Sequence, residues 1–365
     1  SLSLIEFNRS HLEEAQRLCQ KGINAAPQFA PLHLVMGAIH QAKGLKTDSL
    51  TSYDKALELN PNYVEALINS GVLLRDIGNH KSALERFNHV LTFDPDNKSA
   101  LVNCGIILTE FKESETAIRM FKHLIGLSPD YDYALGLLGY EQLHLCDWSE
   151  FEILSKAIVE GVREGKRTCK SLAFMSFSDS AEDHQAAAKL FTSQFCPKKP
   201  QSYWQGERYY HKRIKIAYIS PDLREHPVAH LLAGTIENHD KSRFEVTGIS
   251  LGIDDGSRLR NRLIQSFDNF IDGRQLGSSQ IASTIRDLEI EIAIDLSGYT
   301  SDSRTEIFAY RPAPVQVNYL GYPGTMGTDF MDYIIADARV IPENHQQFYN
   351  EKVVYLPDSY LPFDN

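Results

Sequence analysis

Small and apolar residues recur with a period of 34 positions along the first 145 residues of the chain. Four prolines follow this spacing, and a glycine stands ten residues after each of them (Pro27 and Gly37, Pro61 and Gly71, Pro95 and Gly105, Pro129 and Gly139). A small and a bulky residue, four positions apart, also repeat before each proline, so both would lie on one helix face. This period is typical of tetratricopeptide helix pairs, which become stable by stacking. The pattern therefore predicts an α-solenoid over residues 1–145.

Two asparagines, Asn69 and Asn103, occupy the same position of successive repeats, two residues before the repeat glycine. The flanking repeats carry Val35 and Leu137 at this position. An asparagine amide offers an acceptor and two donors, so a row of them could hold an extended peptide backbone. Hydrogen bonding to neighbouring helix ends would explain the two residues equally well. Both interpretations stay open at this stage.

The pattern changes after residue 145. Residues 146–212 predict a helical connector, with helices over 145–165, capped near Asp147 or Ser149, and over 180–195. From residue 213 onward, short runs rich in Ile, Val and Tyr alternate with helical stretches. The apolar runs are 213–220, 244–251, 290–297, 314–321, 331–337 and 352–357. The expected helices are 228–239, 257–267, 278–288 and 305–311. Near-continuous apolar runs are typical of parallel strands buried on both faces. Residues 213–365 are therefore expected to form a Rossmann-like, doubly wound α/β domain.

Ligands bind such sheets at the carboxyl ends of the strands, so the segments 220–232, 297–308 and 321–330 should converge on one rim. His226 precedes Pro227 at an expected helix start, where the helix dipole favours the neutral imidazole of a base or hydrogen-bond partner. His230 follows at i+4, which would suit a metal pair. A third ligand is missing nearby, and zinc needs at least three, so no metal is expected. A lone histidine is more often structural, which remains the alternative for both residues.

Two further features lie at these strand ends. Asp295 ends the most hydrophobic run, where a carboxylate either functions or anchors the following turn, and the sequence favours neither interpretation. Gly321, Gly324 and Gly327 would let the backbone approach a sugar or phosphate closely. Their spacing does not match a dinucleotide or P-loop motif, so NAD and ATP are poor candidates. The D-x-D triplets at 94–96 and 130–132 lie in repeat turns, where capping explains them, which argues against a metal-dependent transferase.

Composition narrows the class of protein. The 365 residues carry a net charge of −11 without a visible basic stripe, which disfavours a nucleic-acid partner. The five cysteines are scattered and form no C-x-x-C pair, which is typical of a reducing compartment. The sequence has neither an apolar run long enough to cross a membrane nor a secretory signal at its start. We therefore expect a cytoplasmic protein.

The repeats together with the segments LCDWSEFE, IKIAYISPDLREHPVAHLL and RPAPVQVNYLGYPGT resemble the nucleocytoplasmic protein O-GlcNAc transferases and their bacterial homologues. The resemblance covers essentially the whole chain. It implies a tetratricopeptide superhelix joined to the N-terminal lobe of a GT-B glycosyltransferase. Such enzymes are metal-independent and inverting, and they move N-acetylglucosamine from UDP-GlcNAc to Ser or Thr hydroxyls of proteins bound along the solenoid.

Several residues acquire roles from this resemblance. His226 matches the histidine of the family's H-P motif at the transfer site, where it has been proposed as the base. Leu320, Gly321, Tyr322 and Pro323 match the L-G-Y-P turn of the sugar pocket, Thr300 matches the threonine near the donor, and Asn69 and Asn103 match an asparagine ladder. The expected set is therefore catalytic His226 and Asp295, substrate-binding His230, Thr300, Leu320, Gly321, Tyr322, Pro323, Gly324 and Thr325, and peptide-binding Asn69 and Asn103.

The chain also departs from the family pattern. It stops at LPFDN, where the second GT-B lobe would begin, and in the family that lobe holds the uridine and supplies a lysine for the leaving diphosphate. As given, the chain should hold half an active site, and residues 1–19 resemble the second helix of a repeat, as in an excised piece. Glu291 stands where some members carry a second histidine. Two alternatives remain: a SPINDLY-type enzyme that moves fucose from GDP-fucose, and a non-catalytic scaffold.

Overall fold

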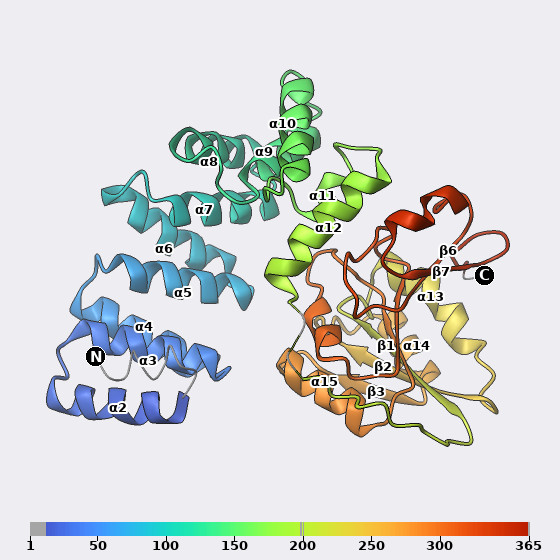
Figure 1. Ribbon diagram of the computed structural model, residues 1–365. Helices are drawn as coiled ribbons and strands as arrows, with labels where there is room; N and C mark the ends of the chain where they lie inside the picture. The colour runs from blue at the N-terminus through green and yellow to red at the C-terminus, as the bar shows by residue number, and fades with distance from the viewer. Residues whose placement is uncertain (1–11, 198, 200, 364–365) are drawn as a thin grey trace. The chain divides into compact units, whose positions relative to one another are not determined.

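The computed structural model describes residues 12–197, 199 and 201–363. It divides the chain into two compact units, Ser1–Leu154 and Ser155–Asn365, and each is described by itself (Figure 1). The helix expected at the start of the chain is seen from Leu12 onward, and its residues 1–11 lie outside the described part.

The first unit is a stack of helix pairs joined by short turns (Figure 1). Its helices are α2 (Leu12–Ala25), α3 (Ala30–Ala42), α4 (Lys46–Leu59), α5 (Val64–Asp76), α6 (His80–Phe93), α7 (Lys98–Glu110), α8 (Ser114–Leu127), α9 (Ala134–His144) and the beginning of α10 (Phe151–Arg163). The predicted α-solenoid is confirmed. The first helix of each pair begins a few residues after a repeat proline, as the spacing predicted.

The repeat glycines allow the two helices of a pair to approach each other. A Cβ atom added at Gly71 would lie 2.7 Å from Cε1 of Phe87, whose ring is fully buried. The corresponding glycines Gly37 and Gly105 meet Tyr53 and Phe121 in the same way. The repeated glycine and the repeated bulky residue are therefore two sides of one helix contact, which explains why both follow the same period.

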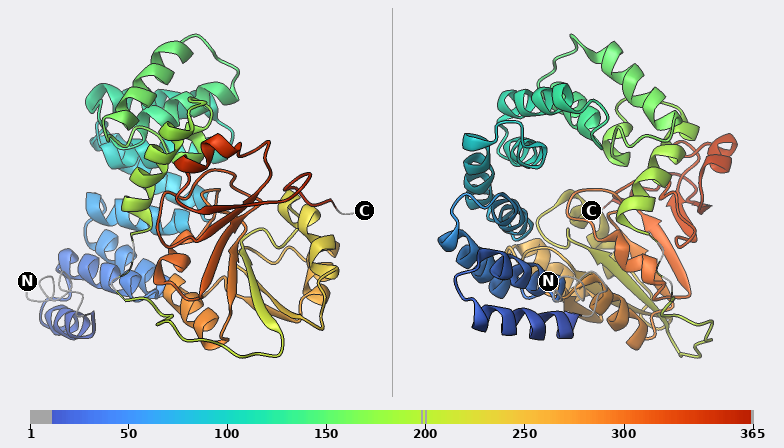
Figure 2. Two further views of the ribbon diagram at one scale, coloured as in Figure 1. Left: turned by 45° about the vertical axis from the view of Figure 1, so that its right-hand side comes forward. Right: turned by 60° about the vertical axis from the view of Figure 1, so that its left-hand side comes forward.

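The second unit contains a seven-stranded parallel sheet of order β3-β2-β1-β4-β5-β6-β7 (Figures 1 and 2). The strands are β1 (Ile214–Ser220), β2 (Phe244–Ser250), β3 (Asn269–Asp272), β4 (Ile292–Asp295), β5 (Val315–Tyr319), β6 (Tyr333–Ala336) and β7 (Lys352–Tyr355). The strand order reverses between β1 and β4. This arrangement confirms the expected Rossmann-like domain.

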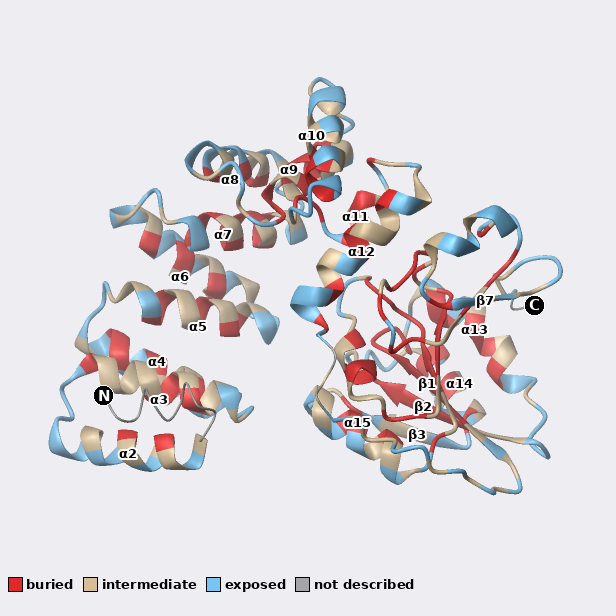
Figure 3. Cartoon of the chain, in the orientation of Figure 1, coloured by how far each residue is buried: buried red, intermediate tan, exposed pale blue. Residues whose placement is uncertain are grey.

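Both faces of the sheet are covered, which explains the near-continuous apolar runs (Figure 3). On β1, Ile216 and Tyr218 pack in one core with α13 (Pro227–Glu237) and α14 (Arg258–Ser266). Their neighbours Ala217 and Ile219 pack in the other core with α12 (Ala181–Phe195), α15 (Ser278–Asp287) and the 3-10 helix η1 (Thr305–Tyr310).

Four elements differ from the sequence expectation. The strand β3 was missed because it spans four residues, of which Asn269 and Asp272 are polar and exposed. The segment expected as a crossover helix at 305–311 forms the 3-10 helix η1, and a second 3-10 helix, η2 (Glu343–Phe348), connects β6 to β7. The short helix α11 (Ser171–Phe174) was also not foreseen.

The connector is integrated into the second unit from Ser155 onward. Ala188 and Cys196 belong to one of the two sheet cores, and the Thr192 hydroxyl donates to the Met326 carbonyl at 2.7 Å. None of the described helices combines the length and the apolar composition that a membrane crossing requires.

Candidate active site

The segments that follow β1, β4 and β5 meet at the carboxyl edge of the sheet. The hydroxyls of Ser220 and Ser297 lie 3.3 Å apart, which joins the ends of β1 and β4. The amide of Gly321 donates to the Leu296 carbonyl at 3.2 Å, which joins the ends of β4 and β5. The predicted convergence of the three segments is confirmed, and it occurs where the strand order reverses.

His226 is the N-cap residue of α13. Its Nδ1 accepts the Val228 amide hydrogen at 3.3 Å, so the neutral ring carries its proton on Nε2. Nε2 lies 3.7 Å from Oδ1 of Asp222, and about a third of the His226 side chain is exposed (34%). A partly exposed imidazole with a carboxylate beside it can exchange a proton with a bound group.

Asp222 is the residue at this edge that sequence reasoning missed. It is 7% exposed, and burial raises the pKa of its carboxyl group, while the charges of His226 and Arg224 oppose this shift. Its spacing of four residues before His226, in a loop after a strand, was the available signal. The structure pairs the two side chains, which is the arrangement of a histidine and the carboxylate that orients it.

The loop that carries His226 is held by the connection after β2. Arg260, almost fully buried on α14, donates from Nη1 to the Leu223 carbonyl at 2.9 Å. The amide of Glu225 donates to Oδ2 of Asp255 at 2.7 Å, and this bond is the main reason why the pKa of Asp255 is lowered to about 2. These contacts limit the motion of the loop between Asp222 and His226.

His230 is exposed, and its Nε2 lies 2.6 Å from Oε1 of Glu225. It therefore interacts with the loop and is not paired with His226. In the part of the chain that the structure describes, no three His, Cys, Asp or Glu side chains are arranged to hold a metal ion.

Asp295, at the end of β4, is buried and holds the next turn. Its Oδ1 accepts the amide hydrogens of Ser297 and Gly298 at 2.9 and 3.0 Å, and Thr305 lies 3.4 Å from Oδ2. Burial raises the pKa of Asp295 to about 6. Of the two interpretations left open by the sequence, these contacts favour the anchor. The hydroxyl of Thr300 closes the same turn by donating to the Ser297 carbonyl at 2.9 Å.

The turn after β5, Leu320–Thr325, is fixed by close backbone contacts. Leu320 has a φ of +76°, a left-handed conformation that is unfavourable for a branched side chain. A Cβ atom at Gly321 would collide with the carbonyl oxygen of Leu296, so this position requires glycine. Tyr322 is buried against Gly298, and Pro323 is half-buried.

Asn318, which sequence reasoning also missed, holds the interior of this turn. Its Nδ2 donates to the carbonyls of Tyr322 and Gly324 at 2.9 and 3.4 Å. The Thr325 hydroxyl donates to Glu351 at 2.7 Å, and Thr325 is 2% exposed. The expected sugar-pocket residues of this turn therefore lie together; Leu320, Tyr322, Gly324 and Thr325 are buried, and Gly321 and Pro323 are half-buried.

Glu291, where some relatives were expected to carry a second histidine, lies just before β4. Its Oε2 accepts the Lys215 amide hydrogen at 2.9 Å. It is therefore at the amino edge of the sheet, away from the segments described above.

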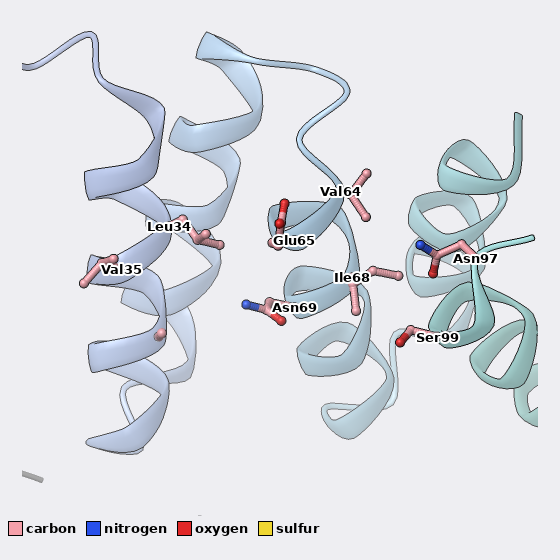
Figure 4. Close-up of a pocket in the computed structure, with 9 residues that line it drawn as sticks. Leu34, Val35, Val64, Glu65, Ile68, Asn69, Asn97 and Ser99 are labelled. Carbon is pink, nitrogen blue, oxygen red and sulfur yellow. The ribbon is translucent and has the colours of Figure 1, made fainter. Parts of the chain in front are cut away.

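In the first unit, Asn69 contributes to a cavity of about 390 Å³ between α3, α5 and the start of α7 (Figure 4). The cavity is lined by Leu34, Val35, Ala38, Val64, Glu65, Ile68, Asn69, Asn97 and Ser99. Burial raises the pKa of Tyr53, and the nearby Ser49 and Asn69 oppose this rise.

Asn103 does not line this cavity. It is 7% exposed, its Nδ2 donates to the Ser99 carbonyl at 2.7 Å, and its Oδ1 accepts a short hydrogen bond from Arg75. Both ends of its amide are therefore engaged within the solenoid. The two asparagines share a repeat position but not an environment.

Comparison with known proteins gives two family matches. Residues 145–365 match the family model of glycosyl transferase family 41, and residues 52–85 match that of the tetratricopeptide repeat. Among solved structures, a mutant O-GlcNAc transferase of Thermobaculum terrenum is similar, with a TM-score of 0.55 and 26% identity over 91% of this chain and 58% of that one.

Similar curated proteins carry related names. The chain is 39% identical over 153 residues to a probable UDP-N-acetylglucosamine-peptide N-acetylglucosaminyltransferase SEC of Arabidopsis thaliana (42% of this chain, 16% of that protein). It is 40% identical over 155 residues to the UDP-N-acetylglucosamine-peptide N-acetylglucosaminyltransferase of Caenorhabditis elegans (42% and 14%). A probable UDP-N-acetylglucosamine-peptide N-acetylglucosaminyltransferase SPINDLY of Solanum lycopersicum is 30% identical over 161 residues (43% and 17%). The chain thus spans only 14% to 17% of the length of these relatives.

Proposed function

Because the chain belongs to glycosyl transferase family 41, we propose that the protein containing it transfers N-acetylglucosamine from UDP-GlcNAc to Ser or Thr hydroxyls of other proteins. One structural observation supports this proposal. The His226 loop, the Ser297–Thr300 turn and the Leu320–Thr325 turn meet at one edge of the sheet. The similar proteins of Arabidopsis thaliana and Caenorhabditis elegans are named for such a transfer. A second lobe that binds the uridine and neutralises the diphosphate belongs to the proposal.

His226 is proposed as the residue that accepts the proton of the attacking hydroxyl. Its bond from the Val228 amide is long, at 3.3 Å, and would be given up when the ring takes the tautomer with its proton on Nδ1 and a free lone pair on Nε2. Once Nε2 has taken the proton, the charge of Asp222 at 3.7 Å stabilises the imidazolium. Asp222 would thus act through His226 as a positioning residue, whereas Asp295 would fix the turn that contains Thr300.

The rest of the proposed site binds the donor and the acceptor. The Leu320–Thr325 turn and Thr300 would contact the sugar, His230 would lie at the margin of the site, and Asn69 would contact acceptor proteins in the solenoid. Fucose transfer from GDP-fucose is the rival, and the lower identity to SPINDLY proteins favours N-acetylglucosamine. Incubating the complete protein with each labelled nucleotide sugar decides between them. A cytoplasmic location stays a prediction from the cysteines.

Replacing His226 tests the proposed chemistry. In the complete protein, His226→Ala should lower kcat by about 100-fold or more, the usual contribution of a general base. The affinity for an acceptor peptide should change little, because the ring would act on the proton and not hold the peptide. Turnover is measured with labelled UDP-GlcNAc and peptide binding by fluorescence anisotropy.

A matched control is His211→Ala. His211 pairs with Glu289 at 2.8 Å before β1, at the opposite edge of the sheet, so its loss should leave kcat near the wild-type value. Equal losses of turnover and peptide affinity in His226→Ala would make His226 a binding residue instead of a base.

A further inference from the structure

A buried carboxylate outside the three strand-end segments reaches the turn after β5. Glu351 directly precedes β7 and is 3% exposed. Its Oε2 accepts the Thr325 hydroxyl hydrogen at 2.7 Å, and its Oε1 accepts the Met326 amide hydrogen at 2.5 Å. The two carboxylate oxygens therefore hold consecutive residues at the end of the expected sugar-pocket turn.

The residues before Glu351 hold the same turn. The Tyr349 hydroxyl donates to the Pro323 carbonyl at 3.1 Å, and the Asn350 amide donates to Oγ1 of Thr325 at 3.2 Å. Three successive residues of the β6–β7 connection thus contact the turn from one side. On the other side of Met326, its carbonyl accepts a hydrogen bond from Thr192 of α12 at 2.7 Å.

The charge of Glu351 is not explained by packing. A buried carboxylate is destabilising unless it is hydrogen-bonded, and burial here raises its pKa. The groups that oppose this shift are hydrogen-bond donors, first the Thr325 hydroxyl and then backbone amides. Several hydrogen-bond donors therefore surround the carboxylate. Each of them belongs to the turn after β5 or to the β6–β7 connection that holds this turn.

We propose that Glu351, assisted by Tyr349, is a positioning residue that fixes the Pro323–Met326 segment in the conformation that accepts the sugar of the donor. This inference rests on the proposed function, because it assigns a consequence for donor binding. Its structural part does not depend on any reaction. It consists of the hydrogen bonds from the Thr325 hydroxyl and the Met326 amide to Glu351, which we call the clamp. Glu351 does not touch the donor in this proposal and acts through the turn.

The kinetic test compares two substitutions in the complete protein. Glu351→Ala should raise KM for UDP-GlcNAc by about tenfold, the scale of one lost hydrogen bond to a charged group, with KM for the acceptor unchanged. Glu351→Gln should raise this KM less than Glu351→Ala does, because its Oε1 can still accept from Met326, while its Nε2 would face Oγ1 of Thr325, which already accepts the amide hydrogens of Asn350 and Gly327. Glu343→Ala, an exposed residue of η2, is the control.

Hydrogen exchange tests the clamp without a substrate. In the 365-residue chain, the Met326 amide should exchange faster in Glu351→Ala than in the wild type or in Glu351→Gln, with the exchange of β1 amides unchanged. Absence of transfer by the wild-type complete protein would refute the proposed function and leave the exchange result valid. Unchanged Met326 exchange in Glu351→Ala, or equal changes of KM for donor and acceptor, would overturn the clamp.

Discussion

At the scale of single residues, Asp295 shows how a buried acid can favour its protonated form. The Thr305 hydroxyl has one hydrogen and donates it to the Gly298 carbonyl at 2.7 Å. Its contact with Oδ2 of Asp295, at 3.4 Å, is therefore best satisfied when Asp295 carries a proton and donates. Burial acts in the same direction and raises the pKa to about 6.

This geometry predicts that Asp295→Asn stabilises the protein at neutral pH. A pKa raised from 3.8 to about 6 means that the favourable contribution of Asp295 is full below about pH 4 and is lost as the pH rises through about 6. Each pKa unit corresponds to about 1.4 kcal/mol, so the variant should gain about 3 kcal/mol at pH 7 and almost nothing at pH 4. Urea unfolding of both proteins across this pH range measures the difference.

The opposite trend, a variant that is less stable at pH 7 than at pH 4 relative to the wild type, would show that Asp295 is held as a carboxylate. In that case its catalytic interpretation would regain support. Asn keeps an acceptor for the Ser297 and Gly298 amides, so loss of the turn does not confound the comparison.

The role of a residue could be predicted from the sequence where that role depends on residues close to it in the chain. His226 was found from its place before Pro227, and Asp222 could have been found from its spacing of four residues. Glu351 could not, because it follows Thr325 by 26 residues and meets it only through the pairing of β5, β6 and β7. The contact of Asn103 with Arg75 likewise crosses from one repeat to the next.

At the scale of elements, strong periodicity predicted the structure well. The repeat helices were found because each buries one face at a regular spacing, and the long strands were found because burial on both faces makes them near-continuous apolar runs. The strand β3 was not predicted because its four residues, which have exposed polar ends, carry almost no periodic signal. The segment 305–311 has helical spacing, but it forms a 3-10 helix of six residues, which ends at Arg311 with a left-handed φ of +49°.

The glycine contact of the solenoid gives a prediction for this scale. Gly71→Ala should lower the free energy of unfolding by about 1–3 kcal/mol, because the new methyl group would overlap the buried ring of Phe87. Gly126→Ala in α8 is the matched control, since a Cβ atom there has no neighbour within 4 Å. The control should be neutral or gain at most about 1 kcal/mol from helix propensity. Denaturant unfolding followed by circular dichroism compares the two, and equal stabilities would refute the packing role.

At the scale of the whole molecule, the change of period in the sequence marked two kinds of architecture. A 34-residue repeat continues only where each unit can stack on an equivalent neighbour, so its end near residue 145 signals another core. The core of the second unit begins earlier than the strands do, because Ala188 and Cys196 of the connector complete it. Residues 196–213 of the connector are polar and aromatic in irregular order, which hid the packing of Cys196 from sequence reasoning.

Because the two units have separate cores, a substitution in the solenoid should change acceptor binding and leave donor binding unchanged. Asn69→Ala, in the solenoid cavity, should weaken acceptor-peptide binding about threefold to tenfold and leave KM for the donor unchanged, because it removes one or two hydrogen bonds.

Asn103→Ala should instead lower the Tm, because it leaves Arg75 without its short hydrogen bond, and change peptide affinity less. Asn62→Ala, an exposed residue of the turn before α5, serves as the control. Peptide anisotropy and thermal unfolding separate the outcomes. Unchanged affinity in Asn69→Ala would assign this residue to packing and would leave peptide recognition to other parts of the solenoid.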